Sequence, residues 1–177
     1  IDDRYKLIPI NENMKPFKVA IIFSGLERSL ANSSYNLRVD ECKAAAYELK
    51  GLANMEYGKF NDTRLRDVPR EIFEEYKSYL PVNWYRRALH FYDENERVML
   101  GVQAWKDGDL DKFGKLIFES GYSSIYNYET GSEELRALYE IMTNTDGIYG
   151  GRFSGAGFKG FCMALIDPEK EESIKTE

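Results

Sequence analysis

The strongest constraint on the fold is a glycine-rich segment between two short apolar runs near the end of the chain. Gly155, Gly157 and Gly160 have the G-x-G-x-x-G spacing, and the flanking residues 147–153 and 161–166 are predicted to be β-strands. Glycine permits positive φ angles and close approach of one backbone to another. The pattern therefore predicts either a tight strand-to-strand turn or a loop whose backbone N–H groups form a nest for an anion.

Three well-known nucleotide-binding loops share this spacing only in part. A Rossmann loop requires a helix directly after the glycines and an acidic residue about 20 residues further on, whereas a strand-like run follows Gly160. A protein-kinase loop requires V-A-I-K, H-R-D and D-F-G segments downstream, and a P-loop requires G-K-S or G-K-T. The chain has none of these segments, so the sequence excludes all three for this loop.

The rest of the chain predicts few strands and many helices. Residues 18–23 form a brief β-branched run typical of a buried strand, and residues 5–8 predict another short strand. Ser132 is a good N-cap, and charged residues at the end of the chain predict the start of a further helix. Helices are expected at residues 37–49, 70–79, 82–106, 110–120 and 133–142.

Composition narrows the class of protein. The 177 residues suit one domain, and the net charge of -6 disfavours binding to a phosphate backbone, so no nucleic-acid partner is expected. No apolar run approaches the ~20 residues needed to span a bilayer, so no membrane partner is expected. Cys42 and Cys162 are predicted to be buried reduced thiols, which indicates a cytoplasmic protein. The chain lacks an initiator Met, which indicates a piece of a longer protein.

Four segments that follow one another along the chain carry a resemblance to a known family. They are residues 29–38 (SLANSSYNLR) followed by Glu41-Cys42, residues 86–98 (RRALHFYDENERV), residues 108–120 (GDLDKFGKLIFES) and residues 147–160 (GIYGGRFSGAGFKG). In these segments the chain resembles the GHMP kinases, the small-molecule kinases that include galactokinase. The last segment resembles the third motif of that family.

The resemblance implies an α+β fold, in which a mainly antiparallel, ferredoxin-like sheet is covered by helices. Residues 1–177 would form the C-terminal domain of such an enzyme. The absent N-terminal half would supply the phosphate loop, the Asp base and most contacts to ATP and Mg²⁺. We therefore expect no catalytic residue and no metal ligand in this chain, and no kinase activity from it alone. Its expected partners are the sugar, ATP and its own N-terminal domain.

The resemblance also implies a set of substrate-binding residues. Tyr35 occupies the position of the tyrosine that contacts the sugar in galactokinases. The glycine-rich loop, comprising Ser154, Gly155, Ala156 and Gly157, would support the phosphate loop, with Ala156 on the sugar side. Arg28 precedes Tyr35 and either meets a phosphate or carboxylate of the substrate or is an exposed arginine. Lys159 either adds positive charge near the sugar or is a solvated loop lysine.

One departure from the galactokinase pattern bears on the substrate. Galactokinases usually have S-H-x-S-L where this chain has Gly121 in place of the histidine. Together with F-S-G-A-G-F-K-G, this makes the chain more similar to the galacturonokinase branch, which phosphorylates the anomeric hydroxyl of D-galacturonate. The predicted function is an ATP-dependent sugar 1-kinase of that kind. A galactokinase, another sugar 1-kinase and a non-catalytic sugar-sensing relative remain as alternatives.

Several polar residues that could imply chemistry have structural interpretations. His90, the only histidine, is expected to pack or hydrogen-bond within a helix rather than to act as a catalytic base. Asp93, Glu94 and Glu96 are expected on a solvated helix face rather than as a carboxylate pair. Residues 121–131, which are rich in aromatic side chains, are expected to combine packing with a surface turn.

Overall fold

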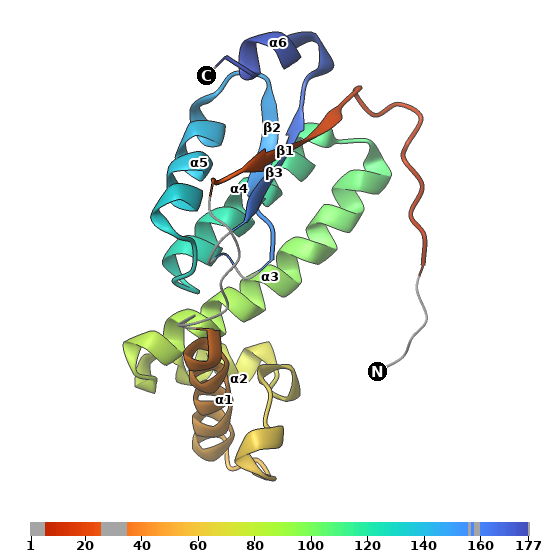
Figure 1. Cartoon of the computed structure of the whole chain (residues 1–177). Helices are drawn as coiled ribbons and strands as arrows, with labels where there is room; N and C mark the ends of the chain where they lie inside the picture. The colour runs from red at the N-terminus through yellow and green to blue at the C-terminus, as the bar shows by residue number, and fades with distance from the viewer. Residues whose placement is uncertain (1–5, 26–34, 156, 158–159, 177) are drawn as a thin grey trace.

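The computed structural model describes residues 6–25, 35–155, 157 and 160–176. It confirms an α+β fold with a small antiparallel sheet and several helices (Figure 1). The elements are β1 (Lys18–Phe23), α1 (Tyr35–Leu52), α2 (Arg70–Tyr76), α3 (Val82–Asp107), α4 (Leu110–Tyr126), α5 (Glu133–Asn144), β2 (Ile148–Phe153), β3 (Phe161–Ile166) and α6 (Glu171–Ile174). Short 3₁₀ helices lie at Phe60–Asp62, Leu65–Asp67, Lys77–Tyr79 and Pro168–Lys170.

The sheet has the strand order β1-β3-β2, and both strand pairs are antiparallel. Two glycines bring α4 against β2 at backbone distance. A Cβ atom on Gly114 would lie 2.0 Å from the carbonyl oxygen of Tyr149, and one on Gly150 would lie 2.3 Å from the carbonyl oxygen of Gly114. Larger residues at these positions would force the helix away from the strand.

The long helix α3 runs between two differently built ends of the molecule (Figure 1). At one end α1 and α2 pack on α3 around Phe73, whose ring stacks on Tyr92 at a centroid distance of 4.8 Å. At the other end α5 covers the inner face of the sheet around Met142, Phe153 and Cys162. Each end therefore has its own hydrophobic core.

Two strand predictions were wrong in part. Residues 6–10 have no regular structure; the indole N–H of Trp105 instead donates to the carbonyl oxygen of Pro9 at 3.2 Å. Residues 18–23 do form a strand, but it is not buried, since the side chains of Val19, Ile21 and Phe23 are 52%, 67% and 52% exposed. These side chains lie on the outer face of the sheet, where Phe161 and Met163 of the central strand β3 are exposed as well.

The predicted helices are confirmed, and four of them are longer than expected; the helix predicted at 70–79 instead consists of α2 followed by the 3₁₀ helix Lys77–Tyr79. α4 continues through Gly121 to Tyr126, beyond the expected end at residue 120, and the absence of a side chain on Gly121 leaves room for the ring of Tyr139. Ser132 caps α5 as expected, accepting a hydrogen bond from the backbone N–H of Leu135 at 3.3 Å. None of the helices in the described part of the chain is long and apolar enough to cross a membrane.

Candidate functional site

The described residues of the loop that connects β2 to β3 are anchored by backbone hydrogen bonds on both sides. The backbone N–H of Ser154 donates to the carbonyl oxygen of Phe161 at 2.8 Å, and that of Ser132 donates to the carbonyl oxygen of Gly157 at 3.0 Å. The backbone N–H of Ser24, just after β1, donates to the carbonyl oxygen of Gly160 at 2.9 Å. These hydrogen bonds tie the described residues of the loop to the residue before α5 and to the end of β1, and whether the loop also binds an anion stays a prediction.

Positive φ angles explain the glycines of this loop. Gly155, Gly157 and Gly160 have φ angles of 77°, 76° and 115°, a region that other L-residues rarely adopt. A Cβ atom on Gly157 would also lie 2.4 Å from the ring of Phe153, so this position has no room for a side chain. Ala156 and Lys159 lie outside the described residues, and their predicted contacts remain predictions.

Tyr35 is the first residue of α1, and its side chain is 48% exposed. It is therefore accessible at the start of α1, and its contact with the sugar stays a prediction. Arg28 precedes α1 and lies outside the described residues, so its expected contact with a phosphate or carboxylate stays a prediction.

A cluster of ion pairs, which sequence reasoning missed, joins α1, the helix that Tyr35 begins, to α3 and to the turn between α4 and α5. We call Arg38, Glu41, Arg86, Arg87 and Glu129 the arginine–glutamate cluster. Arg87 has a fully buried side chain, which donates from Nε to Glu41 at 2.6 Å and from Nη2 to Glu129 at 2.7 Å. Arg38 donates from Nη1 to Glu41 at 2.9 Å, and Arg86 donates from Nη1 to Glu129 at 2.7 Å.

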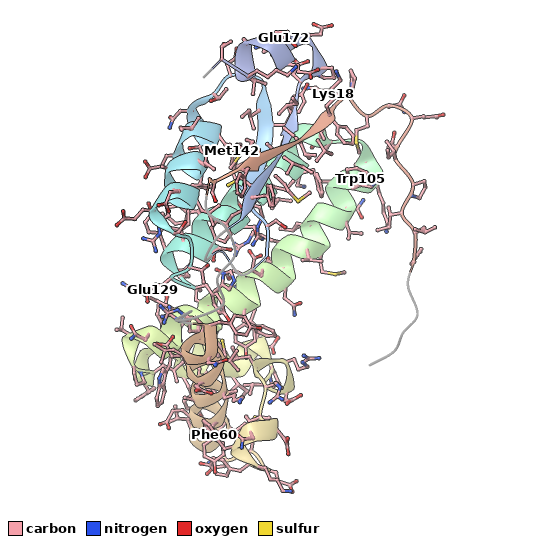
Figure 2. All side chains as sticks on the ribbon, viewed as in Figure 1. Lys18, Phe60, Trp105, Glu129, Met142 and Glu172 are labelled. Carbon is pink, nitrogen blue, oxygen red and sulfur yellow. The ribbon has the colours of Figure 1, made fainter. Side chains whose placement is uncertain are left out.

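The cluster contains three guanidinium groups and two carboxylates. The hydrogen bond from Arg87, with further contributions from Arg86 and Arg38, lowers the pKa of Glu129 below its usual value despite partial burial. Figure 2 shows Glu129 between the end of the molecule that holds the sheet and the end that holds α1 and α2. The only signal in the sequence was that Arg38, Arg86 and Arg87 belong to motif-like segments.

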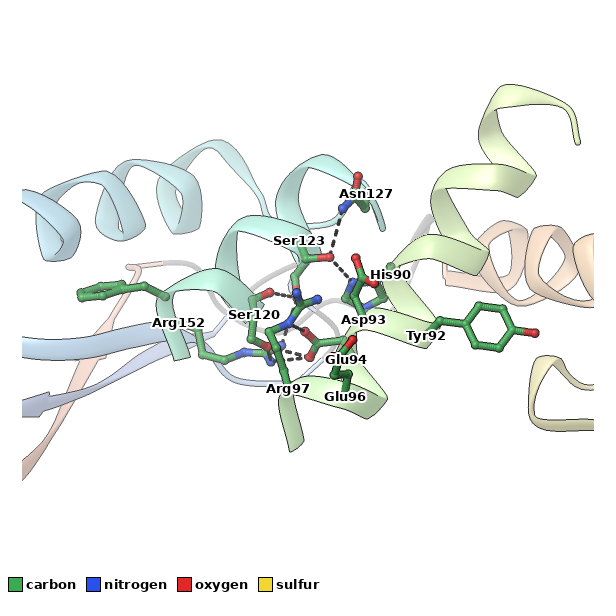
Figure 3. A network of polar contacts seen from close by, with 12 residues as sticks. His90, Tyr92, Asp93, Glu94, Glu96, Arg97, Ser120, Ser123, Asn127 and Arg152 are labelled. Carbon is green, nitrogen blue, oxygen red and sulfur yellow. Dashed lines mark hydrogen bonds and ion pairs between the residues drawn. The ribbon is translucent and has the colours of Figure 1, made fainter. Parts of the chain in front are cut away.

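A second polar network joins α3, α4 and β2 just before the glycine-rich loop (Figure 3). Glu94 accepts hydrogen bonds from Arg97 at 2.6 Å and from Ser120 at 2.7 Å. Arg152, at the end of β2, approaches Glu94 at 3.5 Å and donates to Ser120 and, at 3.2 Å, to Ser124. The network therefore fixes the strand residue that leads into the loop.

The expectation of a solvated face was wrong for Glu94. Burial alone would raise the pKa of Glu94, but hydrogen bonds from Ser120 and Arg97 outweigh it and lower the pKa. Asp93 and Glu96 instead pair with Arg70 at 2.9 Å each, and Glu96 is exposed as expected. The difference arises because helical spacing places Glu94 toward α4 and β2, which the local sequence does not reveal.

His90 has the structural role that the sequence predicted. Its Nδ1 atom lies 2.9 Å from the hydroxyl of Ser123, and its ring stacks on Tyr128 at a centroid distance of 4.8 Å. Burial lowers the pKa of His90 to about 4. The imidazole is therefore neutral at neutral pH and joins α3 to α4.

The two cysteines differ in exposure. Cys162 is buried as predicted, whereas Cys42 is only partly buried, and both are free thiols. Burial raises the pKa of each thiol to about 11. Both are therefore protonated and poor nucleophiles at neutral pH.

Two further surfaces lie near the loop. An open cavity of about 470 Å³ lies between α3, α4 and residue Ile8, and its largely apolar wall ends at Glu94 and Arg152. The outer sheet face is apolar and is formed by Val19, Ile21, Phe23, Phe161 and Met163, with side chains between 42% and 67% exposed. Within the described part of the chain, no three His, Cys, Asp or Glu side chains gather in a way that could hold a metal ion.

Comparisons with known proteins agree with the motifs. Residues 102–177 match the family described as GHMP kinases C terminal. The chain is 44% identical over 170 residues to a galacturonokinase from Arabidopsis thaliana, covering 96% of this chain and 39% of that protein. It is 33% identical over 174 residues to a galactokinase from Lactobacillus helveticus, covering 97% of this chain and 42% of that protein.

A solved structure shares the whole arrangement. The crystal structure of Lactococcus lactis galactokinase complexed with galactose superimposes with a TM-score of 0.81 at 26% identity. The match covers 98% of this chain and 42% of that one. The chain thus spans about two fifths of the length of the relatives that it matches.

Proposed function

The chain carries a GHMP kinase C-terminal domain, and from this we propose that it is the C-terminal part of an ATP-dependent sugar 1-kinase acting on D-galacturonate. The observation that carries the proposal is the 44% identity to a galacturonokinase over nearly the whole chain, against 33% to a galactokinase over the same span. In the proposed reaction, the γ-phosphoryl group of ATP passes to the anomeric hydroxyl of the sugar. Such a transfer depends mainly on positioning and on stabilisation of charge.

The packing around Gly121 supports the proposal of a galacturonokinase rather than a galactokinase. A Cβ atom at this position would lie 2.5 Å from the ring of Tyr139 and 3.2 Å from the Cβ atom of Arg152. The histidine that galactokinases usually carry here would displace one of these side chains. Arg152 leads into the glycine-rich loop, so the support behind that loop differs from the galactokinase pattern.

The proposal gives the residues of this chain supporting roles. The hydroxyl of Tyr35 would hydrogen-bond the sugar, and the glycine-rich loop would support the phosphate loop of the N-terminal half. Ala156 would line the sugar side, and Arg28 would meet the carboxylate or a phosphate. The Asp base and the contacts to ATP and Mg²⁺ are assigned to the N-terminal half. The proposed part of the present chain is therefore to position the sugar and the phosphate loop against each other.

The N-terminal half is also the proposed partner of the outer sheet face. A contiguous exposed apolar surface of this kind marks an interaction site on a protein. The rings of Phe23 and Phe161 pack together there at a centroid distance of 4.9 Å, yet both remain 42% exposed or more. Since the chain spans only about two fifths of its relatives, the rest of the same protein is the natural cover.

The test is a comparison of two sugars with the full-length protein. We expect kcat/KM to be higher for galacturonate than for galactose, with the product identified as the 1-phosphate by ³¹P NMR. Galactokinase is the second candidate, favoured by the superposition on a galactokinase structure. Equal or better use of galactose would replace our assignment with that one. Sugar binding without any phosphoryl transfer would favour a sensing relative.

A further inference from the structure

The turn between α4 and α5 is held in an unusual conformation. Glu129 has a φ angle of 56°, in the left-handed region that residues other than glycine rarely adopt. Such a conformation persists only where the surroundings over-determine it. Here Arg86 and Arg87 bind the two carboxylate oxygens at 2.7 Å each, and Arg87 also donates to the carbonyl oxygen of Asn127 at 2.5 Å.

One side of this turn is tied to the helix that begins with Tyr35. Arg38 lies one helical turn after Tyr35, and its Nη2 atom is 3.3 Å from the carbonyl oxygen of Glu129 and 3.5 Å from its carboxylate. The residue before Glu129 is Tyr128. Burial raises the pKa of Tyr128 most, Cys42 raises it further, and Tyr35 is the next group that raises it, so the start of α1 lies near the turn. The first turn of α1 is therefore bound to the turn that contains Glu129.

The other side of the turn is tied to the glycine-rich loop. Three residues after Glu129, the backbone N–H of Ser132 donates to the carbonyl oxygen of Gly157. Between them, a Cβ atom on Gly131 would lie 3.3 Å from the ring of Phe153, the same ring that underlies Gly157. The turn thus contacts the loop through main-chain atoms and through one aromatic ring.

We propose that Glu129 is a positioning residue, which holds Tyr35 and the glycine-rich loop in the relative geometry that the sugar requires. This rests on the proposed function. Tyr35 and Gly157 belong to distant parts of the chain, and the turn around Glu129 contacts the structures that carry both. Without the Glu129 carboxylate, Arg38 and the fully buried Arg87 would keep only Glu41, and Arg86 would lose the carboxylate that it binds. The turn would then lose the contacts that maintain its conformation.

The test compares variants of the full-length enzyme. Glu129→Gln keeps the size of the side chain but removes its charge, and should raise KM for the sugar about 10- to 100-fold, as expected for lost charged hydrogen bonds. The KM for ATP should change less than about twofold, because the residue acts on the sugar side. Glu129→Asp should recover most of the loss, because it keeps a carboxylate and aspartate tolerates the left-handed region.

Three controls separate positioning from stability. Glu134→Gln changes an exposed glutamate in the first turn of α5 and should leave every parameter unchanged. Arg86→Gln removes one partly exposed partner of Glu129 and should raise the KM for the sugar by a smaller factor. This variant provides an independent measurement if Glu129→Gln folds poorly. In a Tyr35→Phe background, Glu129→Gln should have a smaller effect than in the wild type, because the two residues act together.

Hydrogen exchange of the full-length protein supplies a readout that does not depend on activity. Glu129→Gln should accelerate exchange in the first turns of α1 and in the β2–β3 connection, while Glu134→Gln should not. A lower melting temperature with unchanged sugar KM and unchanged exchange in these two segments would overturn the proposal. If the wild type phosphorylates no sugar, the proposed function fails, and the exchange comparison still decides whether Glu129 couples the two segments.

Discussion

Substituting alanine for Gly157 tests the reasoning about the glycine-rich loop most directly. Two costs are expected. An L-residue in the left-handed region costs about 1–2 kcal/mol, and Gly157 has a φ angle of 76°. The new Cβ atom would also lie 2.4 Å from the ring of Phe153, which is 2% exposed and packed in the core under the sheet. Overpacking of this kind costs about 1–3 kcal/mol.

Gly155 provides a matched control within the same loop. Its φ angle of 77° is almost the same, but a Cβ atom there would meet nothing within 4 Å. Gly155→Ala should therefore incur only the backbone cost of about 1–2 kcal/mol. The difference between the two variants isolates the contact with Phe153.

The assay is thermal unfolding of the two variants and the wild type in the full-length protein. The expected difference of about 1–3 kcal/mol between Gly157→Ala and Gly155→Ala corresponds to roughly 2–12 °C in the melting temperature of this domain. Equal melting temperatures would refute the reasoning, because they would show that the ring of Phe153 does not limit the loop. If Gly155→Ala had the melting temperature of the wild type, the expected cost of placing an L-residue at a positive φ angle would be refuted.

Three further predictions concern activity and pH. The isolated chain should not phosphorylate galacturonate or galactose, and a turnover of about 1–100 per second, as in typical kinases, would contradict the division of labour proposed above. Tyr35→Phe in the full-length enzyme should weaken sugar affinity by about 0.5–1.5 kcal/mol in a calorimetric titration, and unchanged affinity would remove Tyr35 from the site. The pKa of His90 is lowered from 6.5 to about 4, so the unfolded chain binds its proton more readily than the folded one. Stability should therefore fall as the pH drops from 6.5 toward 4, and His90→Gln should flatten that part of the melting-temperature profile; an unchanged slope would contradict it.

Much of the local structure could be predicted from the sequence, because short-range chemistry determines it. Helical periodicity identified α3, α4 and α5 with their approximate bounds, and Ser132 was recognised as an N-cap. The glycines at positions 155, 157 and 160 indicated positive φ angles between two strands, which the structure confirms. The motif-like segments also indicated the family before any fold was known.

The exposure of individual residues depended on neighbours that are distant in the chain. Alternation in residues 18–23 shows which side chains share a face, but whether that face is covered depends on strands and segments elsewhere. In the structure the outer face of β1 is exposed, as is the same face of the neighbouring strand β3. In the same way, Glu94 looked solvated within its helix, yet it meets Arg152, 58 residues further along the chain.

In the candidate site, too, some residues could be named from local sequence motifs, whereas others were found only in the tertiary structure. The sequence proposed Tyr35 and the glycine-rich loop, because each lies in a recognisable local motif, together with Arg28 and Ala156; the site roles of all of them remain predictions. It did not identify Glu129, since a single glutamate in a turn has no local signature. Only the tertiary structure brings Arg38, Arg86 and Arg87 around that carboxylate. Ion pairs of this kind form between side chains that only folding brings together, so their partners follow from the packing of α1 and α3 against the α4–α5 turn.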